Sequence, residues 1–492
     1  MSILVRPCQT LSHLIEAKAV QVLLRPSTYS IAAIYQTNNS IRIPPLLLKV
    51  LSSLLDVGNY NNYNNNNNTT PAISMHHQLL QLLLDPSILM GLFTLLVDVI
   101  IAVLLERIAS QRLFNQDDEE TVLQQELPPQ IKPPYDHIFP TTQSPSTKKS
   151  SSSKSSRPQI PMEQIPFIMA SLYYVSPFSI VPSTIYESWQ NLPYALLLLS
   201  LYESSRHGCY ISLSTFWLSL AVYIEPSMCV YVIPLTGLYL SSSSSSSRSS
   251  SASPPQGGGA IWELIITLLL FMIWTVCLQL LSMNLVRSDD DKNTNNMNVL
   301  LASYGDAWLP TNPNLSLQWY FHMEIFTRFR TYFGTIFTTV PFVLVGPLTI
   351  RFYKYPEVLI ASFAMIWTIL RPVQVMLDGN IALIFLLLSP RSLSRMGLAS
   401  FISICCMFVP VILNVVDNWM WLSVNNGNAN YMFFQCLAYN VFMGVILAQF
   451  TSASMQRDKA LRMIHKEKTK QQQLEEKEKE TAGSESTKVE EN

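Results

Sequence analysis

Long apolar runs alternate with polar, low-complexity tracts along this chain. Several of the runs approach the roughly 20 residues that cross about 30 Å of hydrocarbon as an α-helix. They are continuously apolar, whereas the strands of a membrane barrel alternate apolar and polar positions. The pattern therefore predicts an all-α, polytopic membrane helical bundle with about eleven transmembrane or membrane-embedded helices. The runs cover residues 86–105, 165–182, 191–203, 209–224, 227–240, 260–284, 329–349, 356–373, 376–390, 397–422 and 431–452.

The polar tracts divide the chain into three regions. Residues 1–85 form a predicted lumenal region, partly of low complexity, residues 86–455 form the multi-spanning membrane domain, and residues 456–492 form a charged cytosolic tail. Tracts rich in Ser, Lys, Asp or Asn bury too little apolar surface to fold, so we expect disordered loops within the membrane domain. We expect the tail to extend the last helix for a few turns and then to become disordered. The predicted loops lie near residues 107–160, 241–259 and 285–300.

Composition agrees with lipid as the solvent of this chain. Of its 492 residues, 49% are hydrophobic and only 13% are charged, and the mean hydropathy is +0.22. This apolar excess is more than one soluble core needs. The net charge of −1 provides no basic field of the kind that nucleic-acid binding requires, which makes that class of function unfavourable.

Lysine and arginine placement predicts the orientation of the bundle, because basic residues favour the cytosolic side in short loops. With the carboxyl tail in the cytosol, counting backwards puts the loop containing Arg351 and Lys354 in the cytosol and the turn at 423–430 in the lumen. Arg371 and the basic residues near the amino terminus are exceptions to the rule. Four glycosylation sequons fall on the predicted lumenal side, at Asn38, Asn67, Asn68 and Asn314.

Signatures of catalysis are scarce. No HExxH, GxSxG, Walker A or GxGxxG motif occurs, and the His and Cys residues lack metal-ligand spacing, so we assign no catalytic residue, metal or cofactor. Asp56 and residues 289–291 are poor acidic candidates in predicted lumenal segments. Asp98 lies inside an apolar run, where it makes either a hydrogen bond within the bundle or a functional contact. Glu225 lies near a helix end, where we expect it to be solvated.

Residues 315–333, LSLQWYFHMEIFTRFRTYF, form an aromatic-dense segment at the predicted lumenal interface. Aromatic rings of this kind anchor helices among lipid headgroups, and they also line lipid-binding grooves. The segment thus either anchors the bundle or forms such a groove. In both cases we expect Trp319, Tyr320 and Phe326 to contact lipid.

The predicted lumenal turn at residues 424–430, VNNGNAN, is rich in carboxamides. Amide groups donate and accept hydrogen bonds without carrying charge, which suits sugar hydroxyls and phosphate oxygens. They also suit a simple turn, because Asn and Gly tolerate left-handed backbone angles. Composition by itself favours the turn over the binding site.

Several segments, in order and with their spacing, resemble the PIG-U family, a subunit of the glycosylphosphatidylinositol (GPI) transamidase. The resemblance covers roughly residues 165–452. A weaker similarity is found at Ile43-Pro44-Pro45 and in the run that holds Asp98. Where that family has Gly-Asp near a lumenal turn, this chain has Gly379-Asn380. The similar segments are SLYYVSPFSI at 171–180, VYIEPSMCVYVIPLTGLYL at 222–240, NPNLSLQWYFHMEIFTRFRTYF at 312–333 and GNANYMFFQCLAYNV at 427–441.

The resemblance implies a non-catalytic subunit, in the endoplasmic reticulum membrane, of the complex that attaches GPI anchors to proteins. It implies a fold like the multi-helix scaffold of lipid-linked glycosyltransferases, without their acidic catalytic pair. The family's paired asparagines match Asn428 and Asn430, which would bind the GPI headgroup by hydrogen bonds. The implied partners are PIG-K, which would perform the catalysis, together with PIG-T, PIG-S and the GAA subunit.

Two other function classes remain open on the sequence. One is an active GPI or dolichol-linked mannosyltransferase on the same scaffold, which would need an essential lumenal acid, with Asp56 as the only candidate in the first lumenal loop. The other is a transporter, which would need several intramembrane charges along one path, whereas Asp98 is nearly alone.

Overall fold

The computed structural model describes residues 86–125, 164–180, 191–206, 211–247, 258–287 and 313–490. The regular secondary structure of these residues is helical. Helices satisfy every backbone hydrogen bond within one segment, which lipid requires of a chain that crosses it. The predicted all-α class is thereby confirmed for the described part of the chain, while Asp56, residues 289–291 and three of the four sequons lie outside it.

The elements follow the apolar runs of the sequence. In chain order they are α6 (Pro86–Gln125), α7 (Ile165–Val175), α8 (Pro177–Ile180), α9 (Asn191–Ser205), α10 (Ile211–Ile224), the 3-10 helix η5 (Pro226–Tyr231), α11 (Val232–Ser247), α12 (Gly258–Arg287), α14 (Gln318–Glu324), α15 (Thr327–Phe352), α16 (Pro356–Leu370), α17 (Met376–Leu386), α18 (Pro390–Leu393), α19 (Leu398–Cys406), α20 (Phe408–Leu422) and α21 (Ala429–Glu490).

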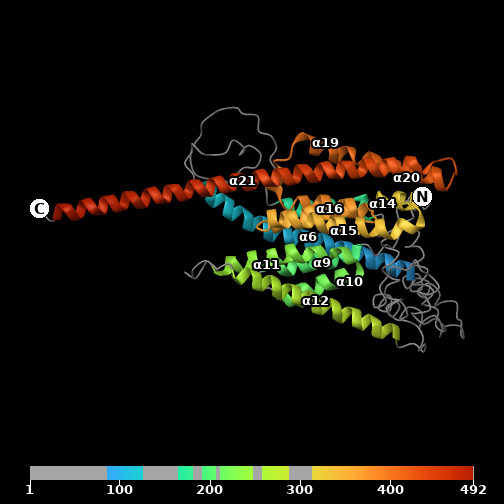
Figure 1. Ribbon diagram of the computed structural model, residues 1–492, viewed down its shortest axis with the longest axis horizontal. Coiled ribbons are helices and arrows are strands. Elements are labelled where there is room, and N and C mark those ends of the chain that lie inside the picture. Colours follow the sequence, from blue (N-terminus) through green and yellow to red (C-terminus); the bar gives the residue numbers. More distant parts are fainter. Residues whose placement is uncertain are drawn as a thin grey trace, which may run out of the picture.

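Most of the helices lie side by side and nearly parallel in one bundle (Figure 1). Helix α9 packs against α6 and α10, and α12 covers the outer side of α10. Helix α16 lies at the centre, in contact with α11, α15, α17 and α21. Nearly all of its residues are buried, as expected for a helix that is apolar on every side.

Four described helical segments are long and apolar enough to cross a membrane, and five shorter apolar helices accompany them. Helices α12 and α15 expose many large apolar side chains, which water would disfavour and hydrocarbon accommodates. The chain is therefore a membrane protein, and the predicted count of about eleven helices stays a prediction. The four long segments are Trp262–Asn284, Thr327–Phe352, Leu398–Trp421 and Ala429–Met463.

Polar contacts between helices gather at two opposite ends of the bundle. The amide end comprises residues 313–320, 371–378 and 423–430, which hydrogen bonds connect around α14. The basic end comprises Arg112 with residues 351–357 and 454–462, which salt bridges connect. Under the orientation predicted from the basic residues, the amide end is lumenal and the basic end is cytosolic.

Three helices extend into segments predicted to be loops or tail. Helix α6 continues to Gln125, inside the predicted loop at 107–160, because Arg112 binds the bundle: its guanidinium donates to the Leu238 carbonyl at 3.0 Å. Helix α11 continues into the Ser tract as far as Ser247, since an anchored helix adds further turns at little cost.

Helix α21 has 62 residues and projects well beyond the bundle, so it replaces the few turns and disordered tail expected there (Figure 1). Its second half is rich in Lys, Glu and Gln, which are good helix formers. Asp458 and Arg462, four residues apart, form a 2.8 Å salt bridge along it.

The opposite placement of the two ends gives a direct topology prediction. A glycosylation acceptor inserted between Asn426 and Gly427 should be modified in microsomes, whereas the same acceptor fused after Glu490 should not. Mobility shifts removed by endoglycosidase would report both sites. Modification of the carboxyl-terminal acceptor alone would invert the orientation.

Candidate functional site

A tight turn connects α20 to α21 at the amide end. Asn425 has φ of 56°, in the left-handed region that Asn tolerates better than most residues. A Cβ atom on Gly427 would lie 2.8 Å from the backbone of Trp421, so a side chain is excluded there. The Asn426 amide donates to the Met420 carbonyl at 3.0 Å and closes the end of α20. The turn has one well-determined shape, which fixes the residues that follow it.

Asn428 is the residue immediately before α21 and caps that helix. Its side-chain oxygen accepts a hydrogen bond from the Asn430 backbone amide at 3.2 Å, the usual geometry of an N-cap. The turn therefore has the structural role that its Asn and Gly content suggested, since it ends in a helix cap. The cap uses only the oxygen of the carboxamide, and the exposed side chain keeps its two N–H donors at a helix N-terminus, where partial positive charge favours anions.

Asn430 connects the turn to α14. The Tyr320 hydroxyl donates to the Asn430 side-chain oxygen at 2.5 Å, and the Tyr320 ring stacks on Phe433 with centroids 4.3 Å apart. The side chain of Asn430 is exposed. As with Asn428, its oxygen is used within the chain and its amide nitrogen is left as a donor. The two asparagines thus present neutral donors side by side.

Two of the three predicted aromatic contacts differ sharply in exposure. Phe326, at the start of α15, is 81% exposed, which fits an interfacial ring. Trp319 is fully buried, with its ring centroid 6.1 Å from that of Trp421. Trp319 therefore packs against Trp421, near the turn, and its ring is not on the surface where lipid would contact it. The sequence could not separate the two, because both lie in one aromatic run.

His322 lies on the same short helix and gave no signal in the sequence. It is buried next to Phe337, and neither ring nitrogen has a partner among the described residues. Burial lowers the pKa of His322 and the positive charge of Arg330 lowers it further, so the ring is neutral at neutral pH.

Residues 313–318 fasten α14 to the rest of the bundle. The Gln318 side chain donates to the Leu370 carbonyl at 2.6 Å, and the Asn440 side chain donates to the Leu315 carbonyl at 3.1 Å. Asn314 is only 1% exposed, and its side-chain oxygen accepts from the Ser316 amide at 2.7 Å. The sequon at Asn314, on the predicted lumenal side, is therefore buried in the folded chain.

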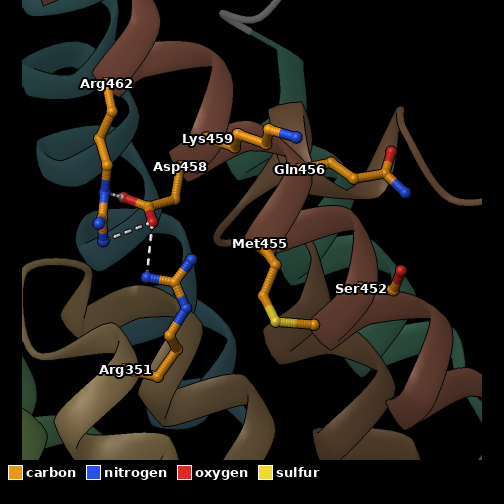
Figure 2. Close-up of a pocket in the computed structure, with 7 residues that line it drawn as sticks. All are labelled: Arg351, Ser452, Met455, Gln456, Asp458, Lys459 and Arg462. Atoms are coloured by element: carbon orange, nitrogen blue, oxygen red, sulfur yellow. Dashed lines mark hydrogen bonds and ion pairs between the residues drawn. The ribbon is translucent and has the colours of Figure 1, made fainter.

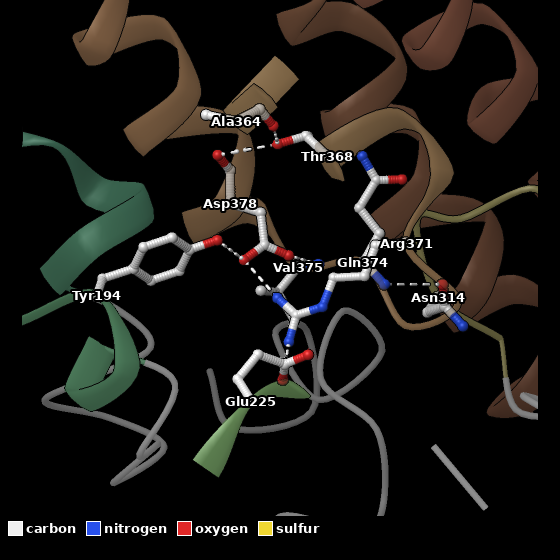
Figure 3. A network of polar contacts seen from close by, with 9 residues as sticks. All are labelled: Tyr194, Glu225, Asn314, Ala364, Thr368, Arg371, Gln374, Val375 and Asp378. Carbon is white, nitrogen blue, oxygen red and sulfur yellow. Dashed lines mark hydrogen bonds and ion pairs between the residues drawn. The ribbon is translucent and has the colours of Figure 1, made fainter. Parts of the chain in front are cut away.

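An ionic cluster lies behind these residues at the same end (Figure 3). Arg371 is placed between two carboxylates: one guanidinium nitrogen donates to Asp378 at 2.7 Å and another to Glu225 at 2.5 Å. The Tyr194 hydroxyl donates to the same Asp378 oxygen at 2.6 Å. The other Asp378 oxygen accepts from the Val375 amide at 3.1 Å and caps α17. These contacts connect α9, η5, α16 and α17.

The cluster explains why Arg371 departs from the positive-inside pattern. Burial opposes the charge of Arg371, but its salt bridges to Asp378 and Glu225 offset that cost. Two carboxylates of the bundle neutralise the charge of Arg371. Arg371 therefore need not lie on the cytosolic side, as an unpaired basic residue would tend to do. Glu225 was expected to be solvated, but its side chain is 26% exposed and paired. The Arg371–Glu225 pair could not be predicted from the sequence, since its two members lie far apart in the chain.

Asp98 makes the hydrogen bonds within the bundle that were one of its two predicted roles. It accepts from the Tyr173 hydroxyl at 2.7 Å and from the Asn191 side chain at 3.1 Å. Asn191 also donates to the Thr94 carbonyl at 3.0 Å. These contacts hold α6, α7 and α9 together. Asn380 donates to Ser179 at 2.9 Å and attaches α17 to α8.

Groups suited to metal binding are not found within the described residues, where no cluster of three or more His, Cys, Asp or Glu side chains occurs. The described site offers neutral hydrogen-bond donors, aromatic rings and a compensated ionic cluster. This chemistry is suited to holding a polar headgroup at a membrane surface.

The helices and the amide end define the class of this chain: a multi-pass membrane protein that presents uncharged donors at one membrane face. The chain belongs to the PIG-U family, since the model of that family, described as GPI transamidase subunit PIG-U, matches residues 22–439. The expected family is confirmed.

Individual relatives carry names from the same complex. The chain is 26% identical over 141 residues to the GPI transamidase component GAB1 homolog of Schizosaccharomyces pombe and 27% identical over 150 residues to GPI transamidase component GAB1 of Saccharomyces cerevisiae. It is 25% identical over 148 residues to GPI-anchor transamidase component PIGU of Mus musculus. Each match covers 29–30% of this chain and 33–36% of the relative, so these alignments span about a third of either length.

Removing the central cation of the ionic cluster should destabilise the protein. Arg371→Met leaves two carboxylates without their partner, and loss of one member of a buried ion pair costs about 3–5 kcal/mol. We expect a clear fall in the thermal unfolding temperature of the purified protein.

Two variants control for other effects of that substitution. Arg328→Met removes an exposed arginine of α15 and should leave the unfolding temperature nearly unchanged. Adding Glu225→Gln and Asp378→Asn to Arg371→Met removes the uncompensated charge and should restore part of the stability. Equal unfolding temperatures for Arg371→Met and Arg328→Met would contradict the role of the cluster.

Proposed function

We propose that this chain is a non-catalytic subunit of the GPI transamidase that binds the GPI lipid at its amide end, in the endoplasmic reticulum membrane. The exposed amide donors of Asn428 and Asn430 carry this proposal. Membership of the PIG-U family supports the assignment to the complex. The chain holds the lipid while a partner subunit transfers it to a protein.

The bonding pattern at the turn favours phosphate over other groups of a GPI headgroup. Both asparagine oxygens accept hydrogen bonds from within the chain, which leaves the N–H donors of two exposed side chains for a ligand. A phosphate only accepts hydrogen bonds at its ionised oxygens, so it matches a site made of donors. The start of α21 adds the favourable field of a helix N-terminus. Hydrogen bonds to a charged group contribute about 1.5–3 kcal/mol each, compared with about 0.5–1.5 for neutral pairs.

Aromatic side chains next to the turn suit the boundary between headgroup and acyl chains. Tyr320 stacks on Phe433 and shares its hydroxyl with Asn430, so it connects an apolar surface to the donors. Phe326 adds an exposed ring at the start of α15. In the proposed complex these rings contact the lipid just below the headgroup, as aromatic belts do at membrane interfaces.

The proposed partners are PIG-K, PIG-T, PIG-S and the GAA subunit, with the chemistry of transamidation in PIG-K. We assign no cofactor and no catalytic residue to this chain. Copurification tests the assembly: a tagged chain should bring down PIG-K and PIG-T.

The alternative of an active mannosyltransferase requires an essential acid in a lumenal loop. Asp56, the candidate from the sequence, lies outside the described residues. Among the described carboxylates at the amide end, Asp378 and Glu225 are engaged with Arg371. The relatives are named as components of the transamidase, which supports the first proposal.

The donors can be removed without disturbing the hydrogen bonds of the turn. In Asn428→Asp with Asn430→Asp, both acceptor oxygens remain, so the N-cap and the Tyr320 contact are kept. The two N–H₂ groups are lost, and negative charge repels phosphate. In cells that lack the endogenous subunit, we expect surface display of GPI-anchored proteins to fall about tenfold or more, with the complex still assembled, by flow cytometry and copurification.

A matched pair separates contact from charge. Asn425→Asp with Asn426→Asp adds the same charge to the same turn, at residues that do not carry the paired donors, and should reduce display much less. Normal display in the Asn428/Asn430 pair would overturn the proposed binding site. Equal loss in both pairs would show that the field of the turn, and not contact with these two residues, is what matters.

A further inference from the structure

A second polar site lies at the basic end, where α15 ends against the middle of α21. The close-up shows a pocket between these helices with charged side chains around its mouth (Figure 2). Its volume is about 330 Å³, enough for a small polar headgroup. The residues that line it are Arg351, Ser452, Met455, Gln456, Asp458, Lys459 and Arg462.

One buried carboxylate organises the cations of this pocket. The Asp458 side chain is 4% exposed and lies 2.8 Å from a guanidinium nitrogen of Arg351 and 2.8 Å from one of Arg462. Each guanidinium has five N–H donors; Arg351 contacts Asp458 through one nitrogen and Arg462 through two, so both keep further donors. Lys459 points away from this trio and makes no contact with the other residues drawn. The lining of the pocket therefore contains three cations and one anion.

Charges behind the pocket do not cancel this excess. The Arg457 guanidinium is buried over the Tyr355 ring, 5.7 Å from its centroid. Glu357, the other acid packed nearby, lies 3.6 Å from Arg112. Every carboxylate of the basic end described here thus faces at least one cation of its own. The pocket has a net positive charge, which is complementary to an anion.

The position of the pocket along the helices points to a lipid as the source of that anion. The α15 span ends at Phe352 and the apolar segment of α21 ends at Met463, so Arg351 and Lys459 lie where hydrocarbon gives way to headgroups. Met455 lines the pocket and is 42% exposed, and Ile350 beside Arg351 is 80% exposed. Acyl chains can pack on these side chains while the phosphate meets the cations.

We propose that this pocket binds the phosphate headgroup of an anionic glycerophospholipid in the leaflet at the basic end. Basic pockets between membrane helices on the cytoplasmic side suit such lipids, because that leaflet is rich in anionic headgroups. The site lies at the opposite end of α15 and α21 from the asparagine turn. It is therefore a separate site, and it does not depend on the proposed GPI binding.

Binding of phosphatidylserine to the purified full-length chain tests the proposal. Phosphatidylserine is the probe because it lacks the inositol of a GPI lipid. The wild type, in detergent micelles, should retain it in preference to phosphatidylcholine when observed by native mass spectrometry. Lys459→Gln with Arg462→Gln should weaken retention about ten- to thirtyfold, since each cation near the surface contributes to binding of anionic lipid. Asp458 keeps its pairing with Arg351 in this variant.

Matched variants distinguish the pocket from general attraction. Lys466→Gln with Lys470→Gln removes two exposed cations from the same helix outside the pocket and should change retention less than twofold. The single variant Lys459→Gln, which breaks no salt bridge of the trio, should give an intermediate loss if the double variant unfolds. Unchanged retention in the pocket variants, or equal loss in both pairs, would overturn the site.

Two further arms identify the ligand. Glycerophosphoserine, the headgroup without acyl chains, should compete poorly; competition as strong as that of the intact lipid would assign the pocket to a soluble phosphate and overturn the lipid. Asn428→Asp with Asn430→Asp should leave phosphatidylserine retention unchanged. A loss in that pair would mean that the lipid binds at the amide end, against the proposal.

Discussion

The interaction of Arg371, which is largely buried, with Asp378 and Glu225 is the one around which the amide end is built. A cation inside an apolar bundle is costly unless anions and hydrogen bonds surround it. Here the anions come from η5 and α17, and Tyr194 of α9 completes the shell of Asp378. The segment that follows Arg371 also contacts residues 313–318, because the Gln374 backbone amide donates a hydrogen bond to the Asn314 side-chain oxygen. The position of α14, and so of Tyr320, depends on this cluster.

The two ends of the bundle use different chemistry for different tasks. At the amide end the charges are compensated in the interior, and the surface offers neutral donors held by a rigid turn. At the basic end one buried acid orients several cations, and positive charge remains in excess.

The sequence predicted the elements that depend on continuous apolarity, such as α12, α15 and α16, because a long apolar run has few other folds available. The residues Asn428, Asn430 and Tyr320, which the sequence singled out, are joined by hydrogen bonds in the structure, and their role in binding stays a prediction. The sequence could not predict the Arg371–Glu225 pair or the burial of Trp319 and Asn314, since these depend on packing between segments distant in the chain. The extension of α6 to Gln125, into the first part of the predicted loop at 107–160, was not predicted for the same reason, because Arg112 binds partners on α11 and α16.

Photocrosslinking tests the central claim most directly, namely that the turn before α21 holds the lipid. A GPI analogue with a photoreactive group beside its phosphate would be irradiated with the assembled complex, and the labelled peptides mapped by mass spectrometry. The account predicts labelling of residues 423–433 and of α14, reduced by competing unlabelled GPI. Labelling confined to other subunits, or to the basic end of this chain, would contradict it.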